Sequence, residues 1–394
     1  MTSIQLSYRL IQEALLTWLA GINTRHLKVN LPLIAAFVAG LVWTRGRASC
    51  LAIAGGGAFT HHALNRLLKG QSLRALLQMA ALTLVDRVGG YLVIDDVVWE
   101  KRGKLIKGVA KLFMPSEKRY VFGLNAVVLA WTNGKGLTVP LSFRFWKPPA
   151  WRSKDGKTHS WHAFDGTPFR TKNELAVELL DWAYQRGFEP TAVAFDAAYL
   201  SAQVLRYLRH RDWQWVARLK GNRVLKLSGR TLRPDEWEEE AKAGRAPAIG
   251  RSLVAHLPGW GQVRVIATRV KEDGSLRYLV GSNPNWGRDK IDRLYGHRWG
   301  IEHAVFRDGK QLAALGDCHC RSFRAQENHF ALSLLALVFL AYQARRHEST
   351  AGALRRLGDR PIALAAAPAP AKVRHIKLER RQCRQEAHPN RRSA

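Results

Sequence analysis

The stretch Tyr295-Gly-His-Arg298-Trp-Gly-Ile-Glu302 decides how the rest of this 394-residue sequence is interpreted. If the stretch is helical, its Tyr, Arg and Glu lie at positions i, i+3 and i+7 and share one face, because successive residues turn by about 100°. A carboxylate on that face can hold a divalent cation, and the phenol and guanidinium beside it can bind phosphate oxygens. The alternative is an amphipathic helix with an Arg298–Glu302 ion pair at i, i+4.

Two other acidic positions, Asp95-Asp96 and Asp196, give this stretch more weight. Each ends or follows a short apolar run that is typical of a β-strand, Leu92-Val-Ile in the first case and Val193-Ala-Phe in the second. If the first strand continues through both of its acids, their carboxylates point to opposite sides, so only one of them lines a site.

Taken together, the three stretches resemble the catalytic motifs of DDE transposases of bacterial insertion sequences, in the group with a Tyr–Arg–Glu–Lys signature. In that family the first Asp follows a hydrophobic strand, the second Asp follows another strand and precedes an aromatic residue, and the Glu ends the pattern Tyr-x-x-Arg-x-x-x-Glu. The flanking pattern extends the resemblance over roughly residues 45–345. The matching residues are Asp95, Asp196, Tyr199, Tyr295, Arg298 and Glu302.

The resemblance implies a catalytic site for DNA cleavage and strand transfer that uses Mg²⁺ or Mn²⁺. Its expected metal ligands and catalytic residues are Asp95, Asp196 and Glu302, with Asp96 as the alternative to Asp95. The family's Asp-x-Thr pattern aligns better with Asp95. The residues expected to hold DNA phosphates near the end of the element are Tyr295, Arg298 and Lys310, whereas Trp299 is expected to pack in the core.

The sequence departs from the family pattern at two positions. Val97 stands where the family usually has Thr or Ser, two residues after the first Asp. The signature Lys usually lies seven residues after the Glu, but position 309 is Gly and Lys310 is one residue further. On a straight α-helix that shift would swing the lysine by about 100°.

The periodicity and the resemblance together predict a mixed α+β or α/β chain with a ribonuclease-H-like mixed sheet. Strands are expected at 91–98, 119–131, 136–145, 192–195 and 213–219, and helices at 171–187 and 201–210. The expected parts are an N-terminal helical DNA-binding domain (1–90), the first part of the catalytic core (91–219), a β-rich insertion between the second Asp and the Glu (220–288), the second part of the core (289–345) and a basic, disordered tail (346–394).

Within the N-terminal part, two short helices capped by Ser49 and Thr60 flank Gly55-Gly-Gly57, and a third is expected at 72–88. Helix, Gly-containing turn and helix is the pattern of a helix-turn-helix DNA reader, which would present Asn65 and Arg66 to DNA. An ordinary helical hairpin fits the same pattern. The basic loop 101–107 is open to the same pair of interpretations, a DNA contact or a solvated loop.

Charge favours a polyanionic partner. The formal net charge is +31 and the pI is about 10.7, which indicates nucleic acid before an anionic membrane surface. No apolar run reaches the roughly 18–20 residues of a membrane span, and the N-terminus lacks the pattern of a signal peptide.

Four cysteines at uneven spacing suit a reducing, bacterial cytoplasm. Cys318-His319-Cys320 lacks the second ligand pair that zinc sites usually have.

The function predicted from these observations is that of a transposase. It would bind the terminal inverted repeats of its element as double-stranded DNA, cut there and join the ends to target DNA, with a homodimer holding two ends together. A host nuclease or resolvase of the same fold would share the carboxylates without reading element ends. A catalytically inactive DNA-binding relic is the remaining alternative, which intact acidic residues disfavour.

Overall fold

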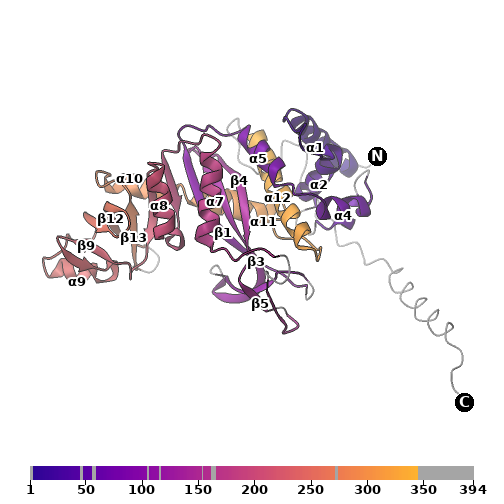
Figure 1. Cartoon of the computed structure of the whole chain (residues 1–394). Helices are drawn as coiled ribbons and strands as arrows, with labels where there is room; N and C mark the ends of the chain where they lie inside the picture. The colour runs from indigo at the N-terminus through magenta and orange to yellow at the C-terminus, as the bar shows by residue number, and fades with distance from the viewer. Residues whose placement is uncertain are drawn as a thin grey trace, which may run out of the picture.

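The structure is a computed structural model that describes residues 3–44, 48–55, 59–103, 106–114, 117–152, 154–160, 166–270 and 274–344. Figure 1 shows a large twisted sheet with the N-terminal helices and α12 at one end and α9 with β9 at the other. Several expected features lie outside the described residues: the Gly56-Gly57 turn, Lys104, Asp273 and the basic tail 346–394.

Eleven strands form one sheet in the described part of the chain, in the order β10-β9-β11-β12-β13-β8-β7-β1-β3-β2, with β4 also paired to β3. The strands are β1 (Tyr91–Glu100), β2 (Ala110–Met114), β3 (Arg119–Thr132), β4 (Thr138–Trp146), β7 (Ala192–Phe195), β8 (Trp215–Leu219), β9 (Leu225–Leu227), β10 (Arg230–Leu232), β11 (Ser252–Leu257), β12 (Gly261–Arg269) and β13 (Leu276–Gly281). A separate small hairpin consists of β5 (Ala150–Arg152) and β6 (Thr158–Ser160).

The middle of this sheet has the mixed topology of a ribonuclease-H-like fold, as predicted. β1 pairs antiparallel with β3 and parallel with β7, and β7 pairs parallel with β8. Parallel neighbours need a crossover connection, which the helix α7 (Lys172–Tyr184) supplies before β7 and α8 (Ala202–His210) supplies between β7 and β8. α7 begins with the capping box that the sequence predicts, in which Thr171 and Glu174 bond each other's backbone N–H.

The β-rich segment between the second Asp and the Glu continues the same sheet. Its last strand, β13, pairs antiparallel with β8, and β12 and β11 follow outward. Three consecutive glutamates of this segment, 238–240, lie in the short helix α9 (Trp237–Lys242). Two of its carboxylates form ion pairs with arginines, Glu238 with Arg269 at 2.8 Å and Glu240 with Arg245 at 2.6 Å.

Helices fill the N-terminal part and cover its side of the sheet. They are α1 (Ser3–Ala20), α2 (Leu31–Trp43), α3 (Cys50–Ala54), α4 (His61–Lys69) and α5 (Arg74–Leu82). The long apolar helix α12 (Phe323–Ala344) packs against α2, α4, α5 and β4, so it joins the N-terminal helices to the sheet. Among the described residues, no helix is both long and apolar enough to cross a bilayer.

Some expected boundaries were wrong. The helix expected at 72–88 covers only α5, because the chain turns at Thr83 and Leu84 to reach β1. β2, β5, β6, β9 and β10 were not predicted; most have only three residues, too few for a period-2 pattern to stand out.

Candidate functional site

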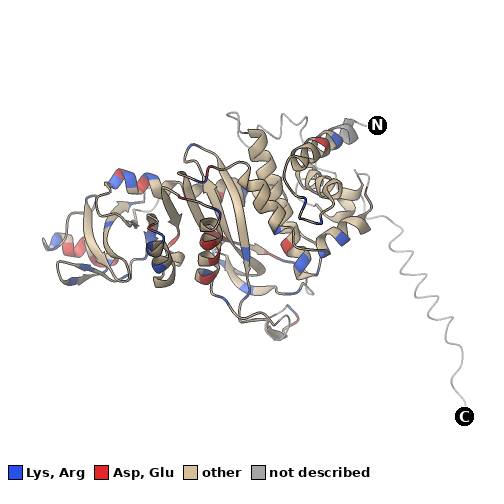
Figure 2. Ribbon diagram, turned by 45° about the horizontal axis from the view of Figure 1, so that its top comes forward, with Lys and Arg blue, Asp and Glu red and all other residues tan. Residues whose placement is uncertain are grey.

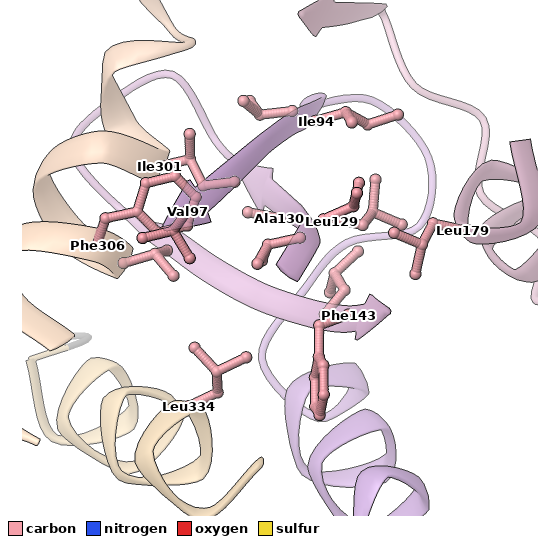
Figure 3. Packing of buried hydrophobic residues seen from close by; sticks show 14 of the residues in the cluster. Ile94, Val97, Leu129, Ala130, Phe143, Leu179, Ile301, Phe306 and Leu334 are labelled. Atoms are coloured by element: carbon pink, nitrogen blue, oxygen red, sulfur yellow. The ribbon is translucent and has the colours of Figure 1, made fainter. Parts of the chain in front are cut away.

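The pleat of β1 sends its two acids to opposite faces of the sheet. Figure 3 shows Val97, two residues after Asp95, beside Ile301 and Phe306 of the helical segment that follows the Arg298 turn. Asp95 shares this face because side chains alternate along a strand. Val97 is only 5% exposed, so an apolar residue fits where the family usually has Thr or Ser.

Asp196 follows β7, the parallel neighbour of β1. Ile94 pairs with Phe195 in this register, so Asp95 and Asp196 are the next residues along two adjacent strands, which lie about 4.8 Å apart. The Asp196 side chain is half-buried and has no hydrogen-bond or ion-pair partner among the described residues. Two of the expected carboxylates therefore come together at one edge of the parallel strands.

The stretch from Tyr295 to Glu302 is not the single regular helix that was expected. Helix α10 (Arg288–Gly296) ends in a turn, and the chain continues as a π-helix, η4 (Ile301–Arg307), followed by α11 (Asp308–Leu312). Gly300 in this turn lies against β4, where an added Cβ would be 2.5 Å from the Thr138 hydroxyl oxygen. The turn thus packs closely on the sheet through Gly300.

Arg298 is the centre of the site's contacts. Its Nη1 donates to Asp95 Oδ2 at 2.6 Å and to Glu302 Oε1 at 2.5 Å, and its Nε donates to the Tyr295 hydroxyl at 3.0 Å. The Arg298 side chain is 7% exposed. The ion pair that the sequence left as an alternative is therefore present, and it includes a second carboxylate from β1.

Trp299 lies beside this ion pair and not in the core. It is 41% exposed, which corrects the expectation that it packs inside. The Arg298 guanidinium carbon is 4.7 Å from the centre of its ring, a cation–π distance.

Several carboxylates lie close together in the site, and this affects the pKa of Asp95. Burial, with smaller effects from the charges of Asp96 and Glu302, raises the pKa of Asp95 to about 7 against the opposing effect of Arg298. Burial alone would lower the pKa of Arg298, but attraction to Asp95, Tyr295 and Glu302 outweighs it and the pKa is raised. One guanidinium thus does not fully compensate the buried negative charge.

Asp96 lies in a separate network on the other face of β1. Its Oδ2 accepts from Lys172 Nζ at 2.7 Å and from Asn125 Nδ2 at 2.6 Å, and its Oδ1 accepts from the Tyr199 hydroxyl at 2.9 Å. Sequence reasoning missed Lys172 and Asn125. Two signals were available: the capping box fixes Lys172 at the first turn of α7, and Asn125 is a lone amide in an apolar strand.

The π-helix gives a physical reason for the displaced lysine. A π-turn contains about one more residue than an α-turn, because its hydrogen bonds join i and i+5. η4 contains Glu302 and ends before Lys310, so Lys310 takes about the angular position that the seventh residue after Glu302 has on an α-helix. Gly309 is buried, and a Cβ there would be 3.0 Å from Leu315, so a lysine at that position has no room. Lys310 itself is exposed.

Asn65 and Arg66 lie on α4, in the N-terminal helices, and the structure does not bring them to the carboxylates. Arg66 is exposed, whereas the Asn65 side-chain oxygen accepts a hydrogen bond from the Cys320 thiol at 3.3 Å. Helices α3 and α4 pack on each other and against α2. Both a helix-turn-helix and a helical hairpin remain compatible with this packing.

Hard oxygen donors characterise the site, and their chemistry suits Mg²⁺ or Mn²⁺. Among the residues that the structure describes, no group of three His, Cys, Asp or Glu side chains has the arrangement of a metal site. Instead, the Arg298 guanidinium lies between the carboxylates of Asp95 and Glu302 and supplies positive charge there. The unpartnered Asp196 carboxylate and the incompletely neutralised Asp95 fit a further cation.

Comparison with known proteins assigns the family. Residues 24–276 match the model of a family described as DDE superfamily endonuclease, and no curated protein matches the chain. The match includes Asp95 and Asp196 and ends before Glu302. DDE endonuclease domains act on DNA and generally use divalent metals. Because the matched region exceeds half of the 394 residues, the chain belongs to the DDE superfamily endonucleases.

Proposed function

We propose that this protein is a transposase that binds the terminal inverted repeats of its mobile element and performs metal-dependent cleavage and strand transfer by a cut-and-paste mechanism. The observation that carries the proposal is the meeting of Asp95, Arg298 and Glu302 beside Asp196. These residues come from three stretches more than 200 positions apart at the extremes, and family membership explains why acids meet there.

The metal ligands in this proposal are Asp95, Asp196 and Glu302. A pair of divalent ions bound there would activate the attacking water or 3′-hydroxyl and stabilise charge on the leaving oxygen. Asp96 is not needed as a ligand, because Lys172, Asn125 and Tyr199 already satisfy its two oxygens. Its role in the proposal is to fix the middle of β1 against α7.

Arg298 has two roles in the proposal. Without a metal ion it neutralises part of the charge of Asp95 and Glu302, and this contact holds η4 on β1. With a divalent cation held by Asp95 and Glu302, the guanidinium would be free to bind a DNA phosphate, for which its planar fork is suited. Lys310, exposed on α11, would bind a second phosphate of the same strand.

DNA recognition is assigned to two parts of the chain. Helices α3 and α4 would read the element ends through Asn65 and Arg66, and the net charge of +31 would supply the sequence-independent attraction to the backbone. Cut-and-paste transposition brings two ends together, so a homodimer on DNA is part of the proposal. The site of action is the bacterial cytoplasm, at the nucleoid.

A cleavage assay with the wild-type protein tests the proposal. The substrate is a DNA duplex that carries the gene's own flanking sequences, compared with the same duplex after those flanks are scrambled, each with Mg²⁺. Cutting confined to the junctions of the native flanks supports the transposase. Equal cutting of both duplexes would indicate a nuclease of the same fold, and tight binding without any cutting in Mg²⁺ or Mn²⁺ would indicate a relic.

A further inference from the structure

A basic groove lies between the N-terminal helices and the beginning of α12, and none of the carboxylates Asp95, Asp196 and Glu302 lines it. Its volume is about 770 Å³. Residues of α3 and α4 form one wall, and the segment 319–324 with the beginning of α12 forms the other. The basic residues that line it are Lys69, Lys107, Lys147, Arg321 and Arg324, and these five residues define the basic groove.

Charge in the basic groove is strongly one-sided. Glu327 is the single acidic side chain among its lining residues, and it pairs with Arg324 at 3.3 Å. Lys69 and Arg321 are exposed and have no carboxylate partner among the described residues. Figure 2 shows Lys and Arg gathered where α4 and the beginning of α12 lie side by side. Such a concentration of cations attracts a polyanion.

The walls of the groove are held firmly together. Asn328 on α12 donates to the carbonyl oxygens of Leu68 and Gln71 at 3.0 and 2.9 Å, next to Lys69. The Lys107 backbone N–H donates to the Arg321 carbonyl oxygen at 3.2 Å. The segments that carry Lys69, Lys107 and Arg321 are therefore bonded to neighbouring segments, which lowers the cost of ordering them on binding.

We propose that the basic groove binds the sugar-phosphate backbone of double-stranded DNA, as a contact separate from the carboxylate site. The distribution of positive charge in the groove indicates which molecule binds there. The five cations come from four separate segments and line a groove of about 770 Å³, which is far larger than a single small phosphate needs. A chain of evenly spaced phosphates is complementary to that layout. The proposal rests on the proposed function only in taking DNA as the polyanion.

The contact has a consequence for the reaction. Because α4 forms one wall and α12 the other, DNA in the groove touches the N-terminal helices and the catalytic part together. Phosphate contacts fix the register and orientation of a duplex without reading its sequence. The groove would thus orient a bound element end relative to the sheet that carries Asp95 and Asp196.

The first test removes two charges in matched ways. The full-length double variant Lys69→Gln/Arg321→Gln is compared with Lys226→Gln/Arg230→Gln, which removes two exposed charges from β9 and β10 at the other end of the sheet. Binding of a fluorescent duplex is measured by anisotropy over a range of salt. The groove variant should lose about 1.8 units of log–log salt slope, or roughly 0.9 per phosphate contact, and about tenfold in affinity, while the control keeps both. Equal losses in the two variants, or no loss in either, would overturn the proposal.

The second test uses Cys320, which lines the groove, to report whether DNA covers the groove. Cys320 is half-buried and lines the groove, so its thiol can be alkylated there. Iodoacetamide labelling of each cysteine is followed by peptide mass spectrometry. Saturating duplex should slow the labelling of Cys320 several-fold, and a polyglutamate peptide of equal charge should not. Unchanged labelling with the duplex bound, or equal protection by the peptide, would contradict a DNA backbone site.

The two tests separate this inference from the proposed function. If the wild type binds and cuts its flanking DNA while the groove variant behaves like its control, the groove inference fails and the transposase remains. If the wild type does not bind DNA at all, both fail.

Discussion

At the scale of single residues, burial makes ionisation of the Asp95 carboxyl group unfavourable. Its folded pKa of about 7 lies above the ordinary value of 3.8 for an aspartate. Between those two values the folded protein binds more protons than the unfolded chain, so this group's contribution to stability is full at low pH and is lost as pH rises through about 7. We predict that, in EDTA, the stability of the wild type relative to Asp95→Asn falls from pH 4.5 to pH 7.5.

Urea unfolding of the two proteins at several pH values measures this difference. The comparison is needed because other groups titrate in the same range: burial lowers the pKa of His329 to about 3, which makes stability rise with pH between there and its ordinary value of 6.5. That effect is common to both proteins and cancels. Parallel pH profiles would show that Asp95 is not a buried, strained charge.

Arg298 provides a second prediction at this scale. Arg298→Lys keeps the charge, but one ammonium cannot reproduce the planar set of donors that reaches Asp95, Glu302 and Tyr295. The variant should remain folded by circular dichroism and cut DNA at least about tenfold more slowly, a loss of about 1.4 kcal/mol in transition-state stabilisation. Arg293→Lys, an exposed change on α10, is the control. A variant that unfolds readily but keeps full activity in its native fraction would reduce Arg298 to a structural ion pair.

At this scale, the sequence predicted which residues lie together better than it predicted the contacts between them. Asp95 and Asp196 were predicted because each ends or follows an apolar run, and Glu302 because it ends the pattern Tyr-x-x-Arg-x-x-x-Glu. That Arg298 bonds two carboxylates could not be read, because it depends on a turn that brings η4 onto β1. The Asp96 network joins four elements, β1, β3, α7 and the turn after β7, and no local pattern connects them.

At the scale of elements, the turn before η4 positions both Arg298 and Glu302. Gly300→Ala should destabilise the protein by roughly 1–2 kcal/mol, because the new Cβ overlaps the Thr138 hydroxyl, and this overpacking outweighs the better helix propensity of Ala. Urea unfolding measures the loss. DNA cleavage should fall with it, since the turn carries the site.

Thr138 supplies the controls for this prediction. In Gly300→Ala/Thr138→Ala the hydroxyl is gone and the nearest remaining contact of the new Cβ, at 3.6 Å, is ordinary, so stability should return in part. Thr138→Val puts a methyl group in place of the hydroxyl and should not restore it. Equal effects of the two rescue changes would mean that the turn does not press on β4 at this point.

The π-helix shows where element prediction from the sequence ends. The sequence shows that the signature lysine, Lys310, stands one residue later than in the family pattern, where position 309 is Gly. On a straight α-helix this shift would turn the lysine away from its expected direction. In the structure, the π-helix η4 accommodates the extra residue. The local sequence does not predict a π-helix, because no residue type is specific to one. By contrast, the start of α7 was predicted correctly, since capping residues act locally.

At the scale of the whole molecule, the sheet is longer than the catalytic fold requires. The segment 220–288 was expected as a separate β-rich insertion, and its strands continue the sheet through β13 and β8. Alternating strands were visible in the sequence. Their partner was not, because strand pairing across long separations depends on the whole fold and not on periodicity.

Salt dependence is the whole-molecule consequence of the net charge of +31. Residues 372–394 contain eight Lys and Arg against two Glu. Deleting them should lower the log–log salt slope of DNA binding, with preference for element ends over random DNA unchanged, because backbone contacts carry no sequence information. Anisotropy with both duplexes measures this. Loss of end preference on deletion would place the reader in the tail and not in α3 and α4.

The claim that Asp95, Asp196 and Glu302 form one metal-dependent catalytic site is tested most directly by strand cleavage in Glu302→Gln. The change removes a charge with little change of shape, so cleavage of flank-bearing DNA in Mg²⁺ should be abolished while DNA binding survives. Asp95→Asn and Asp196→Asn should give the same loss, and combining them should add little, because such a site works as a unit. Asp96→Asn, whose carboxylate is held by Lys172, Asn125 and Tyr199, should retain much of the activity. Wild-type cleavage by Glu302→Gln would contradict the account.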